Sequence, residues 1–180
     1  MANYSDLFPR GTDGATIASV QSVSLSGGGA TRSETITSVD LSKSIIIRNG
    51  HSEPTNNFEA SQVQRMALFQ NSTTLADKGP DSGGSNIASD YMILEFASGI
   101  KSLQTFVVTL STSASATTNQ AVMSVDLTKA VLIYTGVHAT TGASGTVSAR
   151  VKLTTSTNVA CSRIGDAITS ECGFILVEFE

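Results

Sequence analysis

The chain has no tryptophan, three tyrosines and only two cysteines in its 180 residues. No apolar run approaches the roughly 18 residues that a membrane-spanning helix needs, and residues 1–10 lack the apolar core of a secretion signal. These absences argue against a membrane partner and against export. We therefore expect a soluble protein that folds in a cytoplasm.

Charge is also scarce, at 14% of residues. The eleven lysines and arginines are scattered and outnumbered by fifteen acidic residues, which gives a net charge of −4. Nucleic-acid binding needs clustered basic side chains to contact phosphates, so we expect no nucleic-acid partner. Serine, threonine and glycine are abundant between short apolar stretches, a composition typical of all-β surface or particle proteins.

The chain repeats itself. Residues 38–44 read Ser-Val-Asp-Leu-Ser-Lys-Ser, and residues 124–130 read Ser-Val-Asp-Leu-Thr-Lys-Ala. Three further pairs of similar blocks follow the same order, namely residues 17–21 with 100–104, 65–68 with 150–153, and 91–96 with 174–179. The paired blocks lie 83 to 86 residues apart, so the sequence predicts a tandem duplication of one small domain.

We divide the chain into an N-terminal arm (residues 1–16), a first repeat (17–98) and a second repeat (99–180). Alternating apolar and polar residues, β-branched triplets and frequent turn residues predict five or so strands per repeat and no helix. The expected strands are residues 19–25, 35–39, 44–48, 62–70 and 90–96, then 102–110, 121–125, 130–135, 146–154 and 173–179. The predicted fold is all-β, with two small antiparallel sandwich or barrel domains that abut.

Within these strands, three apolar residues follow each repeated turn, Ile45–Ile47 in the first copy and Val131–Ile133 in the second. Continuous β-branched runs of this kind are typical of strands buried on both faces. We therefore expect both triplets to be buried.

The repeated turn contains Asp40 and Lys43 in the first copy, and Asp126 and Lys129 in the second. Both pairs invite a catalytic interpretation. However, an aspartate that accepts backbone N–H groups two residues ahead forms an Asx-turn, which explains the motif without chemistry. No serine sits in a nucleophile elbow and no carboxylate pair recurs, so we expect a non-enzymatic protein without catalytic residues or cofactors.

The two histidines, His51 and His138, are interpreted as loop residues without a role. His51-Ser52-Glu53 matches the His-x-Glu of zinc deaminases, but no Pro-Cys-x-x-Cys follows, and no carboxylate is near His138 in sequence. We expect no metal site.

Cys161 and Cys172 are equidistant from a turn near residues 166–167 and can face each other across a hairpin. A disulfide is geometrically allowed there. Because the first repeat closes the equivalent region without cysteine, the sequence favours two reduced, partly buried thiols.

Four segments of the second copy resemble a small β-domain of tailed-bacteriophage virion proteins. They are Ile-Lys-Ser-Leu-Gln at 100–104, Ser-Val-Asp-Leu-Thr-Lys at 124–129, Arg-Val-Lys-Leu-Thr-Thr-Ser-Thr-Asn-Val at 150–159 and Val-Glu-Phe at 177–179. The resemblance covers residues 99–180 best and 17–98 more loosely. It implies a structural protein that decorates or cements the capsid, or forms an accessory part of the tail or baseplate.

The resemblance also implies a homotrimer or higher oligomer that contacts capsid or tail proteins, assembled in the host bacterial cytoplasm and located in the virion. Within the arm, Tyr4, Leu7, Phe8 and Pro9 match nothing in either repeat and are candidates for docking onto a neighbouring subunit. An alternative is a carbohydrate- or receptor-binding β-sandwich module of a phage tail, although few aromatic residues are present to stack on sugars. A hydrolytic tail enzyme is a remote third interpretation.

Overall fold

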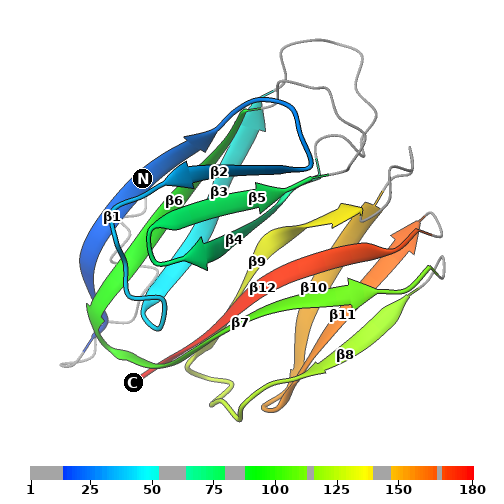
Figure 1. Cartoon of the computed structure of the whole chain (residues 1–180). Coiled ribbons are helices and arrows are strands. Elements are labelled where there is room, and N and C mark those ends of the chain that lie inside the picture. The colour runs from blue at the N-terminus through cyan, green and yellow to red at the C-terminus, as the bar shows by residue number, and fades with distance from the viewer. Residues whose placement is uncertain (1–13, 53–63, 80–87, 113–115, 140–146, 166–167) are drawn as a thin grey trace.

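The structure is a computed structural model of the chain, and it describes residues 14–52, 64–79, 88–112, 116–139, 147–165 and 168–180. These residues form twelve strands and no helix, and all paired strands run antiparallel (Figure 1). The all-β prediction is therefore confirmed. Within the described residues, no helix exists that has the length and apolar character to cross a membrane.

The strands divide into two successive sets of six. The first set is β1 (Thr16–Leu25), β2 (Thr31–Thr35), β3 (Ser44–Ser52), β4 (Met66–Asn71), β5 (Thr74–Lys78) and β6 (Ala88–Ser98). The second set is β7 (Ile100–Leu110), β8 (Thr117–Ala121), β9 (Ala130–Ala139), β10 (Val147–Thr155), β11 (Asn158–Gly165) and β12 (Ser170–Phe179). We call the two sets the first and second halves.

Both halves pair their strands in the same way. In the first half β6 lies between β1 and β3, and β5 lies between β2 and β4. In the second half β12 lies between β7 and β9, and β11 lies between β8 and β10. A ladder contact between β4 and β9 joins two of these groups into a six-stranded sheet of order β2-β5-β4-β9-β12-β7 (Figure 1).

The expected strands 35–39 and 121–125 are wrong. The strands lie earlier in the sequence, at β2 and β8. The segments after them cross between sheets, because β3 belongs to a different sheet from β2, and β9 to a different sheet from β8. Ile36 and Val39 are both buried in this crossing, and their N–H groups donate to the carbonyl oxygens of Thr73 and Ser72 at 2.9 Å. Their spacing of three residues reflects an irregular segment rather than an alternating strand.

A sixth strand in each half was not expected. The polar stretches that follow β4 and β10 make two-residue turns and return as β5 and β11. This hairpin also corrects the sequence alignment, because Asn71 and Thr155 hold the same place before the turn. Met66, and not Arg65, is therefore the counterpart of Arg150.

The termini of the predicted segments also shift. β1 begins at Thr16, within the segment assigned to the arm, and the candidate docking residues Tyr4, Leu7, Phe8 and Pro9 lie outside the described residues.

The connection between the halves is shorter than expected. The expected strands 90–96 and 102–110 leave five residues between them, whereas in the structure β6 and β7 are joined by Gly99 alone. Its φ is +82°, and a Cβ atom there would overlap Ala15, so glycine suits this turn.

The prediction that both apolar triplets are buried holds in part. Ile45 and Ile46 are buried in β3. Val131, the counterpart of Ile45 in β9, is 46% exposed. The expectation is therefore wrong for Val131, although its ladder partner Val177 is fully buried, and Leu132 and Ile133 are only partly buried.

Strand β12 contributes to both hydrophobic cores. Phe174 and Leu176 belong to the core of the second half, whereas Ile175 and Val177 belong to the core of the first half. The ring of Phe179 lies edge-on to Phe96, with 6.0 Å between the ring centroids. Successive side chains of a strand point to opposite faces, so the second half completes the core of the first.

Two glycines allow the halves to approach at the β4–β9 contact. A Cβ atom on Gly136, whose φ is +130°, would overlap the carbonyl oxygen of Arg65 and lie 2.8 Å from the Cα of Met66. A Cβ atom on Gly173 would overlap the Thr135 hydroxyl and lie 2.8 Å from the Met66 Cγ. Met66 is fully buried in the space that these glycines leave.

We predict that Gly136→Ala lowers the free energy of unfolding by about 2–4 kcal/mol, because the methyl group meets backbone across the junction and the positive φ disfavours a side chain. Gly50→Ala is the matched control, since Gly50 holds the equivalent place in β3 and has a φ of +157°. A Cβ atom added there would have no neighbour within 4 Å. We expect that control to cost about 1 kcal/mol or less. Guanidinium unfolding followed by circular dichroism measures both, and equal losses would show that the junction does not depend on Gly136.

Candidate functional site

The repeated turn has the same geometry in both halves. The Oδ1 atom of Asp40 accepts the backbone N–H of Ser42 at 2.9 Å and its hydroxyl at 2.6 Å. Asp126 accepts from Thr128 at 2.9 and 2.7 Å. These hydrogen bonds hold the pKa of both aspartates below the usual value. Both carboxylates are thus engaged in Asx-turns.

The two lysines of the motif act through their backbones. The N–H groups of Lys43 and Lys129 each donate to the carbonyl oxygen of the aspartate three residues earlier, at 3.0 Å. Their own carbonyl oxygens accept from the N–H groups of Phe96 and Phe179, also at 3.0 Å. The Lys43 ammonium lies 4.0 Å from the Asp40 carboxylate, and both side chains are about half exposed. An exposed ion pair of this kind contributes little to stability.

A glutamate anchors each turn to the sheet behind it. The Oε1 atom of Glu95 accepts the Asp40 N–H at 2.8 Å, and that of Glu178 accepts the Asp126 N–H at 2.9 Å. Lys101 donates to Glu178 at 2.8 Å, and this bond holds the Glu178 pKa below its usual value. Neither glutamate was expected from the sequence, although both occupy the same place in the repeated blocks 91–96 and 174–179.

A glutamine in each half binds the crossing segment. The Gln21 amide accepts the Thr37 N–H at 2.9 Å and donates to the Thr37 carbonyl at 3.0 Å. Gln104 does the same with Met123, at 2.7 and 3.3 Å. Both glutamines end the repeated blocks 17–21 and 100–104, so the same repeat signal marks them.

A buried polar cluster occupies the interior of the first half. The fully buried carboxylate of Asp77 accepts the Nε–H groups of Arg32 and Arg65, each at 2.9 Å, and the Tyr91 hydroxyl at 2.9 Å. Arg32 makes a second bond to Asp77 and donates to the Ser89 hydroxyl at 2.9 Å. Backbone carbonyl oxygens of Gly27 and Gly29 accept further guanidinium N–H groups.

Asp77 forms ion pairs with both guanidinium groups of this cluster. Burial lowers the Arg65 pKa, the Asp77 charge opposes that effect, and the Arg32 charge adds to it. Burial and the Asp77 charge raise the Tyr91 pKa, so its hydroxyl stays protonated and donates. Arg48 lies beside the cluster and donates to the Arg65 carbonyl oxygen at 3.3 Å.

The second half places two thiols where the first half places this cluster. By ladder register, Cys161 corresponds to Asp77, and Cys172 corresponds to Ser89. Both cysteines are free and fully buried. The neighbouring Cys161 thiol and burial together raise the pKa of Cys172.

The expected hairpin between the two cysteines is therefore wrong. Cys161 lies in β11 and Cys172 in β12, which belong to different sheets. The thiols meet inside the core, where the sheets face each other, and they are completely rather than partly buried.

The interpretation of His138 as a loop residue without a role is also wrong. His138 is buried in β9, and its Nε2 lies 2.9 Å from the Glu171 carboxylate. Its Nδ1 lies 2.9 Å from the carbonyl oxygen of Ala139. Glu171 also accepts from Lys78 of the first half at 3.1 Å, so His138 belongs to a group of polar contacts that joins the halves. No group of side chains suited to a metal ion occurs among the described residues.

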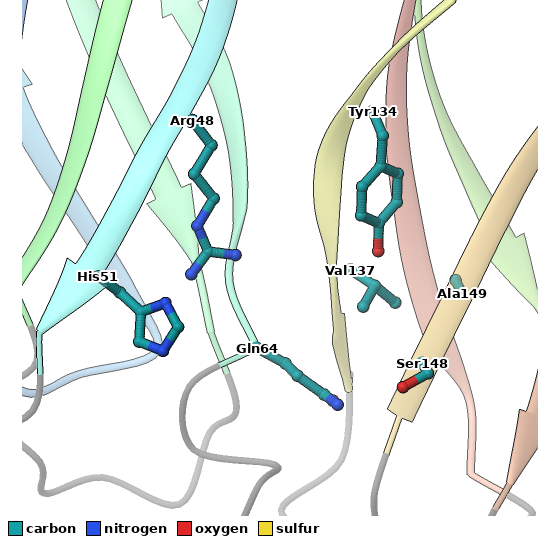
Figure 2. A pocket seen from close by; sticks show the side chains of 7 residues that line it. All are labelled: Arg48, His51, Gln64, Tyr134, Val137, Ser148 and Ala149. Atoms are coloured by element: carbon teal, nitrogen blue, oxygen red, sulfur yellow. The ribbon is translucent and has the colours of Figure 1, made fainter.

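A cleft of about 300 Å³ opens between the halves. Figure 2 shows Arg48, His51 and Gln64 on one wall, facing a second wall from β9 and β10. The second wall is formed by Tyr134, Val137, Ser148 and Ala149. His51, which the sequence also assigned to a loop, lies in β3 and lines this cleft. Among the described residues, the lining contains guanidinium, imidazole, amide and hydroxyl groups.

Comparison of the chain with protein-family models, with curated protein sequences and with solved structures gave no significant match.

We predict that Asp77→Asn lowers the free energy of unfolding by about 3–5 kcal/mol, because it removes the buried negative charge that both guanidinium groups bind. Asp90→Asn is the control, since Asp90 is an exposed carboxylate that bonds a serine hydroxyl. We expect a loss of about 1 kcal/mol or less there. Chemical unfolding compares the two variants, and similar losses would contradict a central role for the cluster.

We also predict that the chain loses stability between about pH 5 and pH 3, in part through Glu178. Its folded pKa lies below the unfolded value, because Lys101 and the Asp126 N–H favour the ionised form. The stabilisation is complete above the unfolded pKa and is lost as the pH falls through the folded pKa. Glu178→Gln should therefore show a shallower fall in unfolding midpoint over this range than the unmodified chain, and parallel curves would rule out this contribution.

Proposed function

We propose that the chain is a non-enzymatic structural component of a tailed-bacteriophage virion. In this role it decorates or cements the capsid, or forms an accessory part of the tail or baseplate. The observation that carries the proposal is the structural role of the motif residues. The side chains and backbone groups of the resembling segments hold the turns, crossings and strands of each half in place, as Asp126 and Glu178 illustrate.

We further propose that the two halves arose by tandem duplication. The shared strand pairing supports this, and so does the recurrence of the same hydrogen bonds at equivalent residues. For example, the Ile36 and Val122 N–H groups donate to the carbonyl oxygens of Thr73 and Thr157 at 2.9 and 3.0 Å. A duplicated, rigid β-unit suits a particle protein, which has to present fixed surfaces to its neighbours.

We also propose that the chain associates with further copies of itself in a homotrimer or a larger assembly. Among the described strands, β1 pairs with β6 alone; it is ten residues long and contains no charged residue. Ile17 and Val20 of this strand are 42% and 55% exposed. Soluble proteins commonly protect such edges with charge, proline or bulges. Within β1 itself, the register shifts on either side of Ile17 are the one such feature.

A second candidate function is a carbohydrate- or receptor-binding module of a phage tail. The cleft between the halves favours it, because polar donors converge there on a concave surface. The two functions are compatible, since a virion subunit can also carry a binding site.

We predict that purified particles of a phage that encodes this chain contain it at a fixed copy number and in one location. Quantitative mass spectrometry and immunolabelling in electron micrographs measure the two properties. Recovery of the chain only in the soluble fraction of the lysate would contradict the proposal.

A variant that lacks residues 1–13 tests the docking role of Tyr4, Leu7, Phe8 and Pro9 in the same particles. We expect the shortened chain to keep its unfolding midpoint and to be incorporated at lower occupancy, because these side chains would lose their burial against a neighbour. Normal occupancy would exclude docking by the arm.

A further inference from the structure

The two buried thiols are reactive groups to which the proposed function gives no role. Cys161 and Cys172 are both free and fully buried, and they belong to one hydrophobic core. Cys161 lies in β11 and Cys172 in β12, which belong to different sheets (Figure 1). A covalent bond between them would therefore join the sheet of β10, β11 and β8 to the six-stranded sheet.

The first half shows that these two positions face each other across the interior. Cys161 corresponds to Asp77, and Cys172 corresponds to Ser89, by ladder register. One guanidinium nitrogen of Arg32 donates both to the Asp77 carboxylate and to the Ser89 hydroxyl. A single donor atom thus spans the two side chains in the first half.

No long side chain comes between the two positions in the second half. Thr118 holds the place of Arg32, because it pairs with Cys161 as Arg32 pairs with Asp77. Its short side chain donates to the carbonyl oxygen of Thr109 at 3.4 Å. The thiols are direct neighbours, since the Cys172 thiol lowers the Cys161 pKa and the Cys161 thiol raises the Cys172 pKa.

A disulfide bond is compatible with this place in a β-sandwich. In antibody domains a buried disulfide connects the two sheets of the sandwich, although packed sheets lie about 10 Å apart. We propose that Cys161 and Cys172 form an inter-sheet disulfide when the chain meets a small-molecule disulfide as oxidant. The structure describes the reduced form of this pair. The inference does not depend on the proposed function.

The reaction is a thiol–disulfide exchange in two steps. With oxidised glutathione, the Cys161 thiolate attacks one glutathione sulfur, and the other glutathione leaves as a thiolate. The Cys172 thiolate then attacks the Cys161 sulfur and releases the second glutathione. The two departing thiolates take up the two protons that the cysteines lose. The cysteine pair gives up two electrons, and these reduce the glutathione disulfide.

Burial limits how the oxidant reaches the thiols. Because neither thiol is exposed, exchange requires a local opening of the fold or takes place during folding. The cleft between the halves adjoins the pair, since Val137, the ladder partner of Cys172, lines it. Tyr134 lines it too, and both thiols act on the pKa of this tyrosine. We therefore expect slow exchange in the folded chain and faster exchange during refolding.

The test is refolding of the full chain from guanidinium in the presence of oxidised glutathione. Intact mass and thiol titration of the denatured product should show a monomer that has lost two hydrogen atoms and has no titratable thiol. Its thermal unfolding midpoint should lie about 5–10 °C above that of the reduced chain, because the bond constrains the unfolded state. Addition of a reductant should abolish this difference.

Cys172→Ser is the matched control, because Ser89 holds the equivalent place in the first half. Cys161→Ala is a second control that adds no buried hydroxyl. Neither variant has both thiols, so their unfolding midpoints should be the same whether they are refolded with or without oxidised glutathione.

Three outcomes would overturn the inference. These are two titratable thiols after oxidative refolding, disulfide-linked dimers in place of the oxidised monomer, and an oxidised monomer whose midpoint lies below that of the reduced chain. The last result would show that the folded core does not accommodate the bond. Because the test uses the isolated chain, each of these results leaves the virion proposal intact.

Discussion

Strand β12 is the element on which the rest of the molecule depends. Phe174 and Leu176 fill the core of the second half, while Ile175 and Val177 fill the core of the first. A unit of about 80 residues buries a smaller fraction of its surface than a larger domain does, and sharing a strand between the two cores raises that fraction. The sharing requires the halves to approach closely, which Gly136 and Gly173 permit by leaving room for Met66. The junction is therefore part of the hydrophobic core rather than a separate interface between finished domains.

The two halves keep the same backbone plan but fill their interiors differently. Where the first half buries Asp77 and Ser89 with two arginines, the second buries Cys161 and Cys172. A buried ion cluster is stable only when every charge is hydrogen-bonded, whereas a pair of thiols is nearly apolar and has little need of partners. The turns, which Glu95 and Glu178 bind in the same way in both halves, are the same whichever polar or thiol groups fill the interior.

The sequence predicts well those features that depend on neighbouring residues. The Asp-Leu-Ser/Thr-Lys motifs anticipate turns at Asp40 and Asp126, and period-two patterns anticipate β7 and much of β10. It fails where a residue's environment is set by distant partners. The charged Asp77 makes the β5 sequence resemble a loop. Its burial is explained by its ion pair with Arg32, which lies 45 residues away. His138 likewise acquires its role from Glu171, 33 residues away, so no local pattern marks it.

The cleft could not be predicted from the sequence for the same reason. Its walls come from segments that are distant in sequence, and neither wall contains a recognisable motif. The equivalent positions Arg48 and Tyr134 nevertheless line the same cleft. Identical side chains at these positions would place two like charges or two like rings in the cleft. Because the two side chains differ, the repeated backbone plan gives the cleft two walls of different chemistry.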